Sequence, residues 1–365
     1  MTPGAIERLL GGRRQDWQAR ALRALLRIAE IPYGWIAAAR NRRFDRRPEL
    51  AQRAGCPVIS VGNLTAGGTG KSPLVRWLCE RLLESGHRPA IVSRGYGARG
   101  GMNDEAMEMR LILPQVAQVA AADRVGAARA AVADHQADCV VLDDGFQHRR
   151  LFRDLDIVLL DALRPFGYGH LLPRGTLREA IGGLRRAQMV GLSRADLVSD
   201  EVRAAIRQQV RQIAPEADWA EISHAPASWI TLDGRQEPVA AAATAAAATT
   251  AGAPRRVAVV CGIGNPIAFV ETLRRAGCEP VAIREFPDHH HYSPADAQAI
   301  MQWARSRNDV DWLVCTVKDL VKLRELIVDP AVPVRALKID VRFLEGEPQW
   351  SQRLHEALRG DRRQL

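Results

Sequence analysis

The sequence has few of the residues that mark several common classes of protein. Its six cysteines include no Cys-x-x-Cys pair, and Cys79, Cys139, Cys261 and Cys315 lie inside apolar runs, which predicts reduced core residues rather than ligands or disulfides. No stretch approaches the ~18 consecutive apolar residues that a membrane-spanning helix needs. An apolar core followed by a small-residue cleavage site, the mark of a secretory signal, is also missing. We therefore expect a cytoplasmic protein that does not cross a bilayer.

Positive charge is the feature present in excess. The net charge is +9, and residues 1–53 hold twelve arginines against five acidic residues. This charge suits an anionic partner such as phosphate, nucleic acid or a membrane surface. On a helical wheel, Arg20, Arg23 and Arg27 lie opposite an apolar side. That side holds Trp17, Ala21, Leu22, Leu25, Leu26 and Ile28. The pattern predicts either a helix on an anionic membrane surface or a surface helix that packs its leucines on the protein body.

A glycine-rich turn carries the strongest chemical signal. The segment V-G-N-L-T-A-G-G-T-G-K-S-P-L-V, residues 61–75, follows a predicted strand and opens a predicted helix, which is the context of a phosphate-binding loop. The usual pattern has glycine where this sequence has Thr65. Lys71 is expected to reach the β- and γ-phosphate oxygens, and the Ser72 hydroxyl to bind Mg²⁺. The backbone expected to cradle the phosphates is that of Thr65, Ala66, Gly67, Gly68, Thr69, Gly70, Lys71 and Ser72.

A second element completes a nucleotide site. In C-V-V-L-D-D-G-F-Q-H-R-R, Asp143 and Asp144 end an apolar run, as expected of carboxylates that bind Mg²⁺ or its water. Guanine-binding proteins of this class usually carry N-K-x-D, and residues 316–319 read T-V-K-D instead. We therefore expect ATP and Mg²⁺ as the bound groups.

Short β-branched runs alternate with longer helical patterns after residue 50. The runs are PVISV, PAIVSRG, DCVVLDDG, DIVLLDA, QMVGLSRAD, RVAVVCGIG and DWLVCTVKD. They predict an α/β fold, a P-loop NTPase-like α/β/α sandwich with a second, smaller α/β domain. The expected regions are the basic amphipathic membrane-surface helix at 1–50, the P-loop domain at 51–239, an Ala/Thr-rich linker or inserted loop at 240–253 and the smaller domain at 254–365.

Other polar clusters suggest an acceptor for the phosphate. Arg94, Arg124, Arg174 and Arg178 are either phosphate clamps or solvated surface charges. The segment F-P-D-H-H-H-Y, residues 286–292, holds three consecutive histidines. Adjacent residues point in different directions, so one histidine acting as a general base is favoured over a zinc site.

Six motifs in this order resemble the tetraacyldisaccharide 4′-kinase family of lipid A biosynthesis, over nearly the whole chain. They are G-N-L-T-x-G-G-T-G-K-S, S-R-G-Y-G, D-D-G-F-Q-H, L-L-P-x-G-x-L-R-E, G-I-G-N-P and D-H-H-x-Y. The resemblance implies that the P-loop domain is a kinase domain and that the active site lies in a cleft between the two domains. It implies transfer of the γ-phosphate of Mg-ATP to the 4′-hydroxyl of an acylated glucosamine disaccharide 1-phosphate, which forms lipid IVA.

The same resemblance assigns roles and a location. Asp104 and His289 are expected to act as an acid/base pair, with Lys71 as the third catalytic residue. The residues expected to contact or support the substrate are Arg94, Tyr96, Arg124, Gln147, His148, Arg178, Glu179 and Asp288. The N-terminal helix is expected to hold the enzyme at the anionic cytoplasmic face of the inner membrane.

Two other functions use the same features. A P-loop nucleotide switch for metal delivery would use the histidines as ligands, but the chain lacks N-K-x-D and Cys-x-x-Cys. A nucleic-acid-binding ATPase would use the basic charge, but arginines on one side of an amphipathic helix suit lipid better than a duplex. We therefore expect no nucleic-acid partner.

Overall fold

A computed structural model describes residues 8–12, 14–95, 104–239, 254–307, 309–330 and 332–360. Contacts divide the chain into two compact units. Unit 1 comprises Met1–Gly95, Val116–Ser223 and Val341–Leu365, and unit 2 comprises Tyr96–Gln115 and His224–Asp340. The units therefore interleave along the sequence, whereas the sequence pattern predicts consecutive domains. The expected linker, residues 240–253, lies outside the described residues.

Unit 1 is built on a parallel sheet in the order β7-β6-β5-β1-β4-β2-β3. Its strands are β1 (Val58–Asn63), β2 (Pro89–Ser93), β3 (Ala117–Ala120), β4 (Cys139–Asp143), β5 (Leu155–Asp161), β6 (Met189–Ser193) and β7 (Asp218–Thr231), which continues into unit 2. Neighbouring strands in this order pair in parallel. Because β1 lies between β4 and β5, the segments that follow β1 and β4 emerge side by side at one edge of the sheet.

Helices cover this sheet. They are α2 (Trp17–Arg46), α3 (Lys71–Glu84), α5 (Arg124–His135), α6 (Asp200–Ile213) and α10 (Glu347–Gly360), with short 3₁₀ turns η1 (Pro48–Leu50), η2 (Gly167–Gly169), η3 (Ile181–Arg186) and η4 (Ala195–Leu197). Alanines of α5 pack on β2 and β4 in one core cluster, and Ile206 and Val210 of α6 join another. Trp350 of α10 is fully buried, and a Cβ at Gly191 would lie 2.8 Å from its ring. The prediction of an α/β fold is confirmed.

Unit 2 is the smaller unit, and its strands β10-β9-β11-β12 pair in parallel in this order. Its strands are β8 (Gln236–Pro238), antiparallel to β7, β9 (Arg255–Cys261), β10 (Cys278–Glu285), β11 (Trp312–Thr316) and β12 (Val334–Glu345), which ends in unit 1. Its helices are α4 (Asp104–Ile112), α7 (Pro266–Arg275), α8 (Pro294–Arg305) and α9 (Val317–Leu323). Helix α4 packs on α9, which joins residues far apart in sequence.

The structure bears on two expectations from the sequence, one about the cysteines and one about membrane-spanning helices. All six cysteines are free and buried, so the prediction that Cys79, Cys139, Cys261 and Cys315 are reduced core residues is confirmed. Within the described part of the chain, no helix combines the length and the apolar character needed to cross a membrane.

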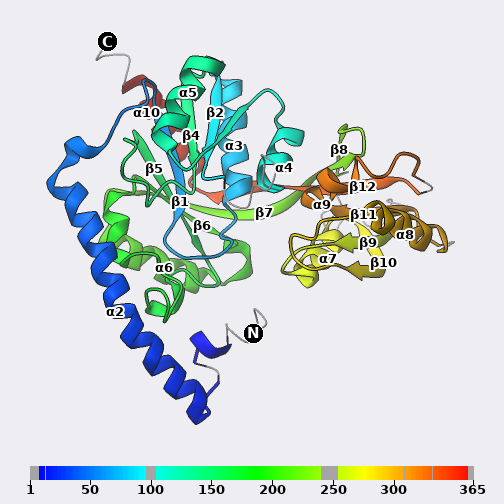
Figure 1. The fold of residues 1–365 in the computed structure, drawn as a ribbon, viewed down its shortest axis with the longest axis horizontal. Helices are drawn as coiled ribbons and strands as arrows, with labels where there is room; N and C mark the ends of the chain where they lie inside the picture. The colour runs from blue at the N-terminus through cyan, green and yellow to red at the C-terminus, as the bar shows by residue number, and fades with distance from the viewer. Residues whose placement is uncertain are drawn as a thin grey trace. The chain divides into compact units, whose positions relative to one another are not determined.

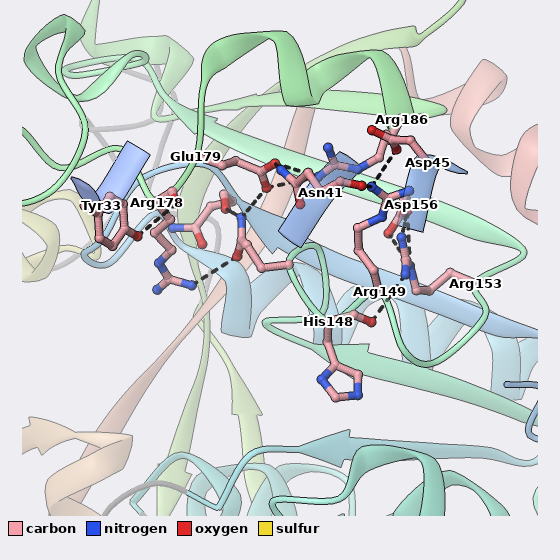
Figure 2. Close-up of polar contacts among 12 residues, drawn as sticks. Tyr33, Asn41, Asp45, His148, Arg149, Arg153, Asp156, Arg178, Glu179 and Arg186 are labelled. Carbon is pink, nitrogen blue, oxygen red and sulfur yellow. Dashed lines mark hydrogen bonds and ion pairs between the residues drawn. The ribbon is translucent and has the colours of Figure 1, made fainter. Parts of the chain in front are cut away.

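Helix α2 lies along one side of unit 1 and is attached to it through polar groups (Figure 1, blue). The Tyr33 hydroxyl donates to the Arg178 carbonyl at 2.9 Å, and Asp45 pairs with Arg149 at 2.6 Å. Glu30 accepts from the Leu171 amide at 2.7 Å. Figure 2 shows Tyr33 beside Arg178, and Asp45 beside Arg149 in another part of the view.

The apolar side of α2 faces outward. Trp17 and Trp35 are 76% and 74% exposed, and Ile28 is also exposed. Leu22 and Leu25 are exposed too, so the alternative in which the leucine side packs on the body is wrong. The helix thus reverses the usual arrangement of an amphipathic surface helix, in which the apolar side is buried.

The carboxylate of Glu179 joins α2 to the body of unit 1. Glu179 is 0% exposed and accepts from Asn41 of α2 at 2.7 Å. It also accepts from the Gln147 amide at 3.0 Å and from Arg186 at 2.8 and 3.0 Å (Figure 2). The Arg186 guanidinium stacks on Phe146 at 4.5 Å. Three segments distant in sequence therefore meet at one buried charge.

We expect Glu179→Ala to lower the free energy of unfolding by about 3–5 kcal/mol, because it leaves the charge of Arg186 partly buried without its partner. Urea unfolding followed by circular dichroism measures the loss. Glu84→Ala is the matched control, because Glu84 forms an exposed pair with Arg81 and its removal should have no measurable effect. Equal stability of the two variants would contradict the central role of Glu179.

Candidate active site

The turn between β1 and α3 has the backbone of an anion site. Gly67 and Gly70 have φ of 118° and 79°, in the region that favours glycine, and a Cβ at Gly67 or Gly68 would meet nothing within 4 Å. Gly70 is the N-cap of α3 and, within the described residues, no side chain caps it. The first N–H groups of α3 are therefore available to an anion.

Lys71 is held over this turn by two oxygen atoms. Its ammonium lies 3.2 Å from Asn63 Oδ1 and 3.3 Å from Asp144 Oδ1. Asn63 is fully buried and donates to the Thr65 carbonyl at 2.7 Å. The Thr69 hydroxyl is buried and has no hydrogen-bond partner among the described residues. The turn thus presents a cation and an unused hydroxyl, both suited to phosphate oxygens.

Asp143 and Asp144 lie beside this turn because β4 pairs with β1, where Val61 is opposite Asp143. Asp144 has a φ of 53°, and its carboxylate pairs with Arg178 Nη1 at 2.7 and 2.8 Å. Its carbonyl accepts from Arg124 at 2.8 Å. Burial alone would raise the pKa of Asp144, but the charges of Lys71 and Arg178 outweigh burial and lower this pKa below its ordinary value. Asp144 is therefore an ionised counter-ion to three cations.

Glycines let the end of β1 and the turn after β4 approach each other closely. A Cβ at Gly62 would lie 2.5 Å from the Cβ of Phe146, and a Cβ at Gly145 would lie 2.6 Å from Ser60 Oγ. Gln147 donates to the Asn63 carbonyl at 2.9 Å as well as to Glu179. The turn after β4 is therefore fixed against the end of β1.

A second group of predicted residues meets in unit 2. His289 Nδ1 lies 3.0 Å from Asp104 Oδ2, although the two residues come from α4 and from the loop after β10. Lys322 of α9 contacts the same carboxylate oxygen at 2.5 Å. Burial would raise the pKa of Asp104, but Lys322 and His289 outweigh it and lower that pKa. His289 is 63% exposed and has a φ of 59°, so its ring is held at the surface by a backbone that most residues avoid.

The neighbouring side chains have other contacts. His290 pairs with Asp296 at 3.4 Å and packs against Phe286 at 4.8 Å. Asp288 Oδ1 is 3.9 Å from His289 Nε2. The histidine that contacts Asp104 is therefore His289, whereas His290 contacts Asp296.

The structure thus places the predicted residues in two groups, one in each unit. The group in unit 1 comprises residues 65–72, Arg124, Asp143, Asp144, Gln147, His148, Arg178 and Glu179, and Arg94 lies exposed after β2. The group in unit 2 comprises Asp104, Asp288 and His289. Tyr96 lies outside the described residues. The sequence patterns did not point to Asn63 and Lys322. Asn63 lies in the glycine-rich segment and Lys322 three residues after Asp319, but only the fold shows what they contact.

Comparisons with known proteins identify similar chains. The family model described as tetraacyldisaccharide-1-P 4′-kinase matches residues 22–359. The tetraacyldisaccharide 4′-kinase of Anaeromyxobacter dehalogenans (strain 2CP-C) is 40% identical over 88% of this chain and 87% of its own length. That of Geobacter sulfurreducens is 32% identical over 94% and 96%. The crystal structure of LpxK from Aquifex aeolicus in complex with ATP matches with a TM-score of 0.71 and 26% identity, over 92% of this chain and 99% of that one.

His148 gives this site a pH-dependent property. Burial, then the charges of Arg124, Arg153 and Arg150, lower the pKa of His148 from 6.5 to about 4. Figure 2 shows its ring pointing away from the network around Glu179. Between pH 6.5 and 4 the unfolded chain binds the proton that the folded chain excludes, so stability falls as pH falls through this window.

We expect the His148 ring to titrate in NMR spectra with a midpoint near pH 4. His148→Gln should lose less stability than the wild type between pH 7 and pH 5, by roughly 2 kcal/mol. His135→Gln, a change at the end of α5, serves as control. A His148 midpoint near 6.5 would contradict the inferred environment.

Proposed function

The chain belongs to the tetraacyldisaccharide-1-P 4′-kinase family, and we propose that its two groups of site residues perform that family's reaction as follows. The enzyme transfers the γ-phosphate of ATP to the 4′-hydroxyl of a tetraacylated glucosamine disaccharide 1-phosphate, a lipid A precursor, and so forms lipid IVA. The observation that carries the mechanism is the Asp104–His289 hydrogen bond in a chain that also has a phosphate loop.

The phosphate loop binds the nucleotide. The N–H groups at the start of α3 and the Thr69 hydroxyl donate to phosphate oxygens, with Thr65, Ala66, Gly67 and Gly68 shaping the turn. Lys71 moves from Asn63 and Asp144 to the β- and γ-phosphates and stabilises the charge that develops during transfer. Arg94, Arg124 and Arg178 add positive charge around the transferred group.

The donor set fits Mg²⁺. Ser72 and the carboxylates of Asp143 and Asp144 are oxygen donors, which Mg²⁺ prefers to nitrogen or sulfur, and they lie on the two segments that emerge beside each other from β1 and β4. When bound, Mg²⁺ neutralises charge on the phosphates. We assign the two adjacent carboxylates, Asp143 and Asp144, together to the ion or its water.

His289 accepts the proton of the 4′-hydroxyl. In the tautomer required, Nδ1–H donates to Asp104 and Nε2 is the free acceptor. Lys322 keeps Asp104 ionised, so this carboxylate orients the ring and stabilises the imidazolium that forms. The exposure of His289 suits a bulky acylated acceptor. Asp288, Gln147, His148, Glu179 and Tyr96 complete the set that contacts or supports the substrates.

The outward apolar side of α2 supports a location at a membrane surface. Exposed tryptophans and isoleucines on a helix tethered by polar bonds suit the boundary between headgroups and acyl chains. We place the enzyme on the cytoplasmic face of the inner membrane, where ATP and the acylated acceptor meet.

Transfer from γ-labelled ATP to tetraacyldisaccharide 1-phosphate in detergent micelles tests the function, with phosphate release measured in parallel without lipid. We expect Lys71→Ala to abolish transfer, because the γ-phosphate loses its cation. Lys318→Ala, which removes a lysine paired with Glu105, should retain most of the activity. Near-normal transfer by Lys71→Ala would remove the phosphate-loop assignment. Hydrolysis by the wild type without labelled lipid would favour a nucleotide switch.

His289→Ala should lower kcat by roughly 10²–10⁴, the usual contribution of a general base, and leave ATP affinity nearly unchanged. His290→Ala is the matched control because His290 is engaged by Asp296, and it should change kcat by a small factor. Steady-state kinetics together with equilibrium ATP binding measure both effects. An unchanged kcat for His289→Ala would transfer the role of base to another group.

A further inference from the structure

The C-terminal part of α2 carries an arginine cluster around a surface hollow. The hollow has a volume of about 410 Å³. Its lining is Ala39, Arg42, Arg43, Arg46 and Arg47. The four arginines are exposed, and none has an ion pair with the residues that the structure describes. We name these four residues the arginine cluster.

The positive charge of the cluster is not balanced by ion pairs with the described residues. Arg42 and Arg46 are four residues apart on the helix, and like charges at this spacing repel, while Arg47 is the residue that caps the end of the helix. The nearest acidic residue in the helix, Asp45, turns toward the body, where it pairs with Arg149. Four cations therefore surround a hollow that favours an anion.

The cluster continues the outward apolar row of α2. Ile28 and Trp35 are two helical turns apart on the exposed side. Spacings of four and three residues carry the row from Trp35 to Ala39, Arg42 and Arg46. Apolar residues thus occupy the N-terminal part of the row, and arginines occupy its C-terminal end. Such an order matches a helix that enters a leaflet obliquely, with its arginine end at the level of the headgroups.

We propose that the arginine cluster is a binding site for the phosphate groups of anionic bilayer lipids. The proposal rests on the membrane location proposed above and adds a specific site and an orientation to it. Arginine forms bidentate hydrogen bonds with phosphate, and the hollow lets several guanidinium groups reach one headgroup. The N-terminal part of α2 then lies deeper in the leaflet, and the cluster sets the depth of the helix.

A charge-matched pair of variants of the full chain tests the site. Arg42→Gln/Arg46→Gln removes two arginines of the cluster, and Arg20→Gln/Arg27→Gln removes two exposed arginines from another side of the same helix. For the cluster variant, the partition coefficient into phosphatidylcholine vesicles with 30 mol% phosphatidylglycerol should fall on the order of thirtyfold. This is the product of a loss of about fivefold for each of the two arginines. The control should lose much less, and pure phosphatidylcholine vesicles should bind both variants and the wild type alike.

If the two variants lost equal partition into anionic vesicles, the proposed site would be wrong, and the net charge of the helix would account for the binding. A second arm separates lipid phosphates from the 1-phosphate of the acceptor. In neutral detergent micelles, a raised KM for tetraacyldisaccharide 1-phosphate in the cluster variant alone would reassign the cluster to the substrate. Phosphate transfer by the wild type in the same micelles tests the proposed kinase independently, so failure of the site and failure of the function are distinguishable.

Discussion

The structure of unit 1 depends on the buried carboxylate of Glu179. A charge withdrawn from water must be paired and hydrogen-bonded, and Glu179 obtains its partners from Asn41, Gln147 and Arg186, on three separate segments. Gln147 also bonds to the Asn63 carbonyl at the end of β1. The helix that faces outward, the turn after β4 and the start of the phosphate loop are therefore held by one connected set of hydrogen bonds.

The same requirement explains the reversed polarity of α2. Its hydrogen-bonding partners on the body are charged or polar groups, including the Arg178 carbonyl and Arg149, so the side of the helix that carries Tyr33 and Asp45 is turned toward the body. The apolar side is then left outside, and none of the described residues of unit 1 covers Trp17, Ile28 or Trp35. At the proposed membrane surface, lipid supplies the apolar partner that this side of the helix needs.

Each of the two groups of site residues contains a carboxylate that a lysine holds ionised. In unit 1, Asp144 balances Lys71, Arg178 and Arg124, cations that suit the charge of ATP phosphates. In unit 2, Lys322 balances Asp104, which leaves this carboxylate able to orient His289. Charge pairs therefore fix both groups before any ligand binds, and in the proposed mechanism this lowers the cost of reorganisation during transfer.

The sequence by itself determined the elements with a strong local pattern. The strands that became β1, β2, β4, β5, β6, β9 and β11 are short buried runs, and glycines with the following lysine fixed the phosphate loop. It did not reveal β3, β7, β8, β10 and β12, several of which are only partly buried and lack a clear period. Only the tertiary structure decided the contacts across long separations. Asn41 meets Glu179 across 138 residues, and Asp104 meets His289 across 185, because chain folding and not local spacing sets such distances.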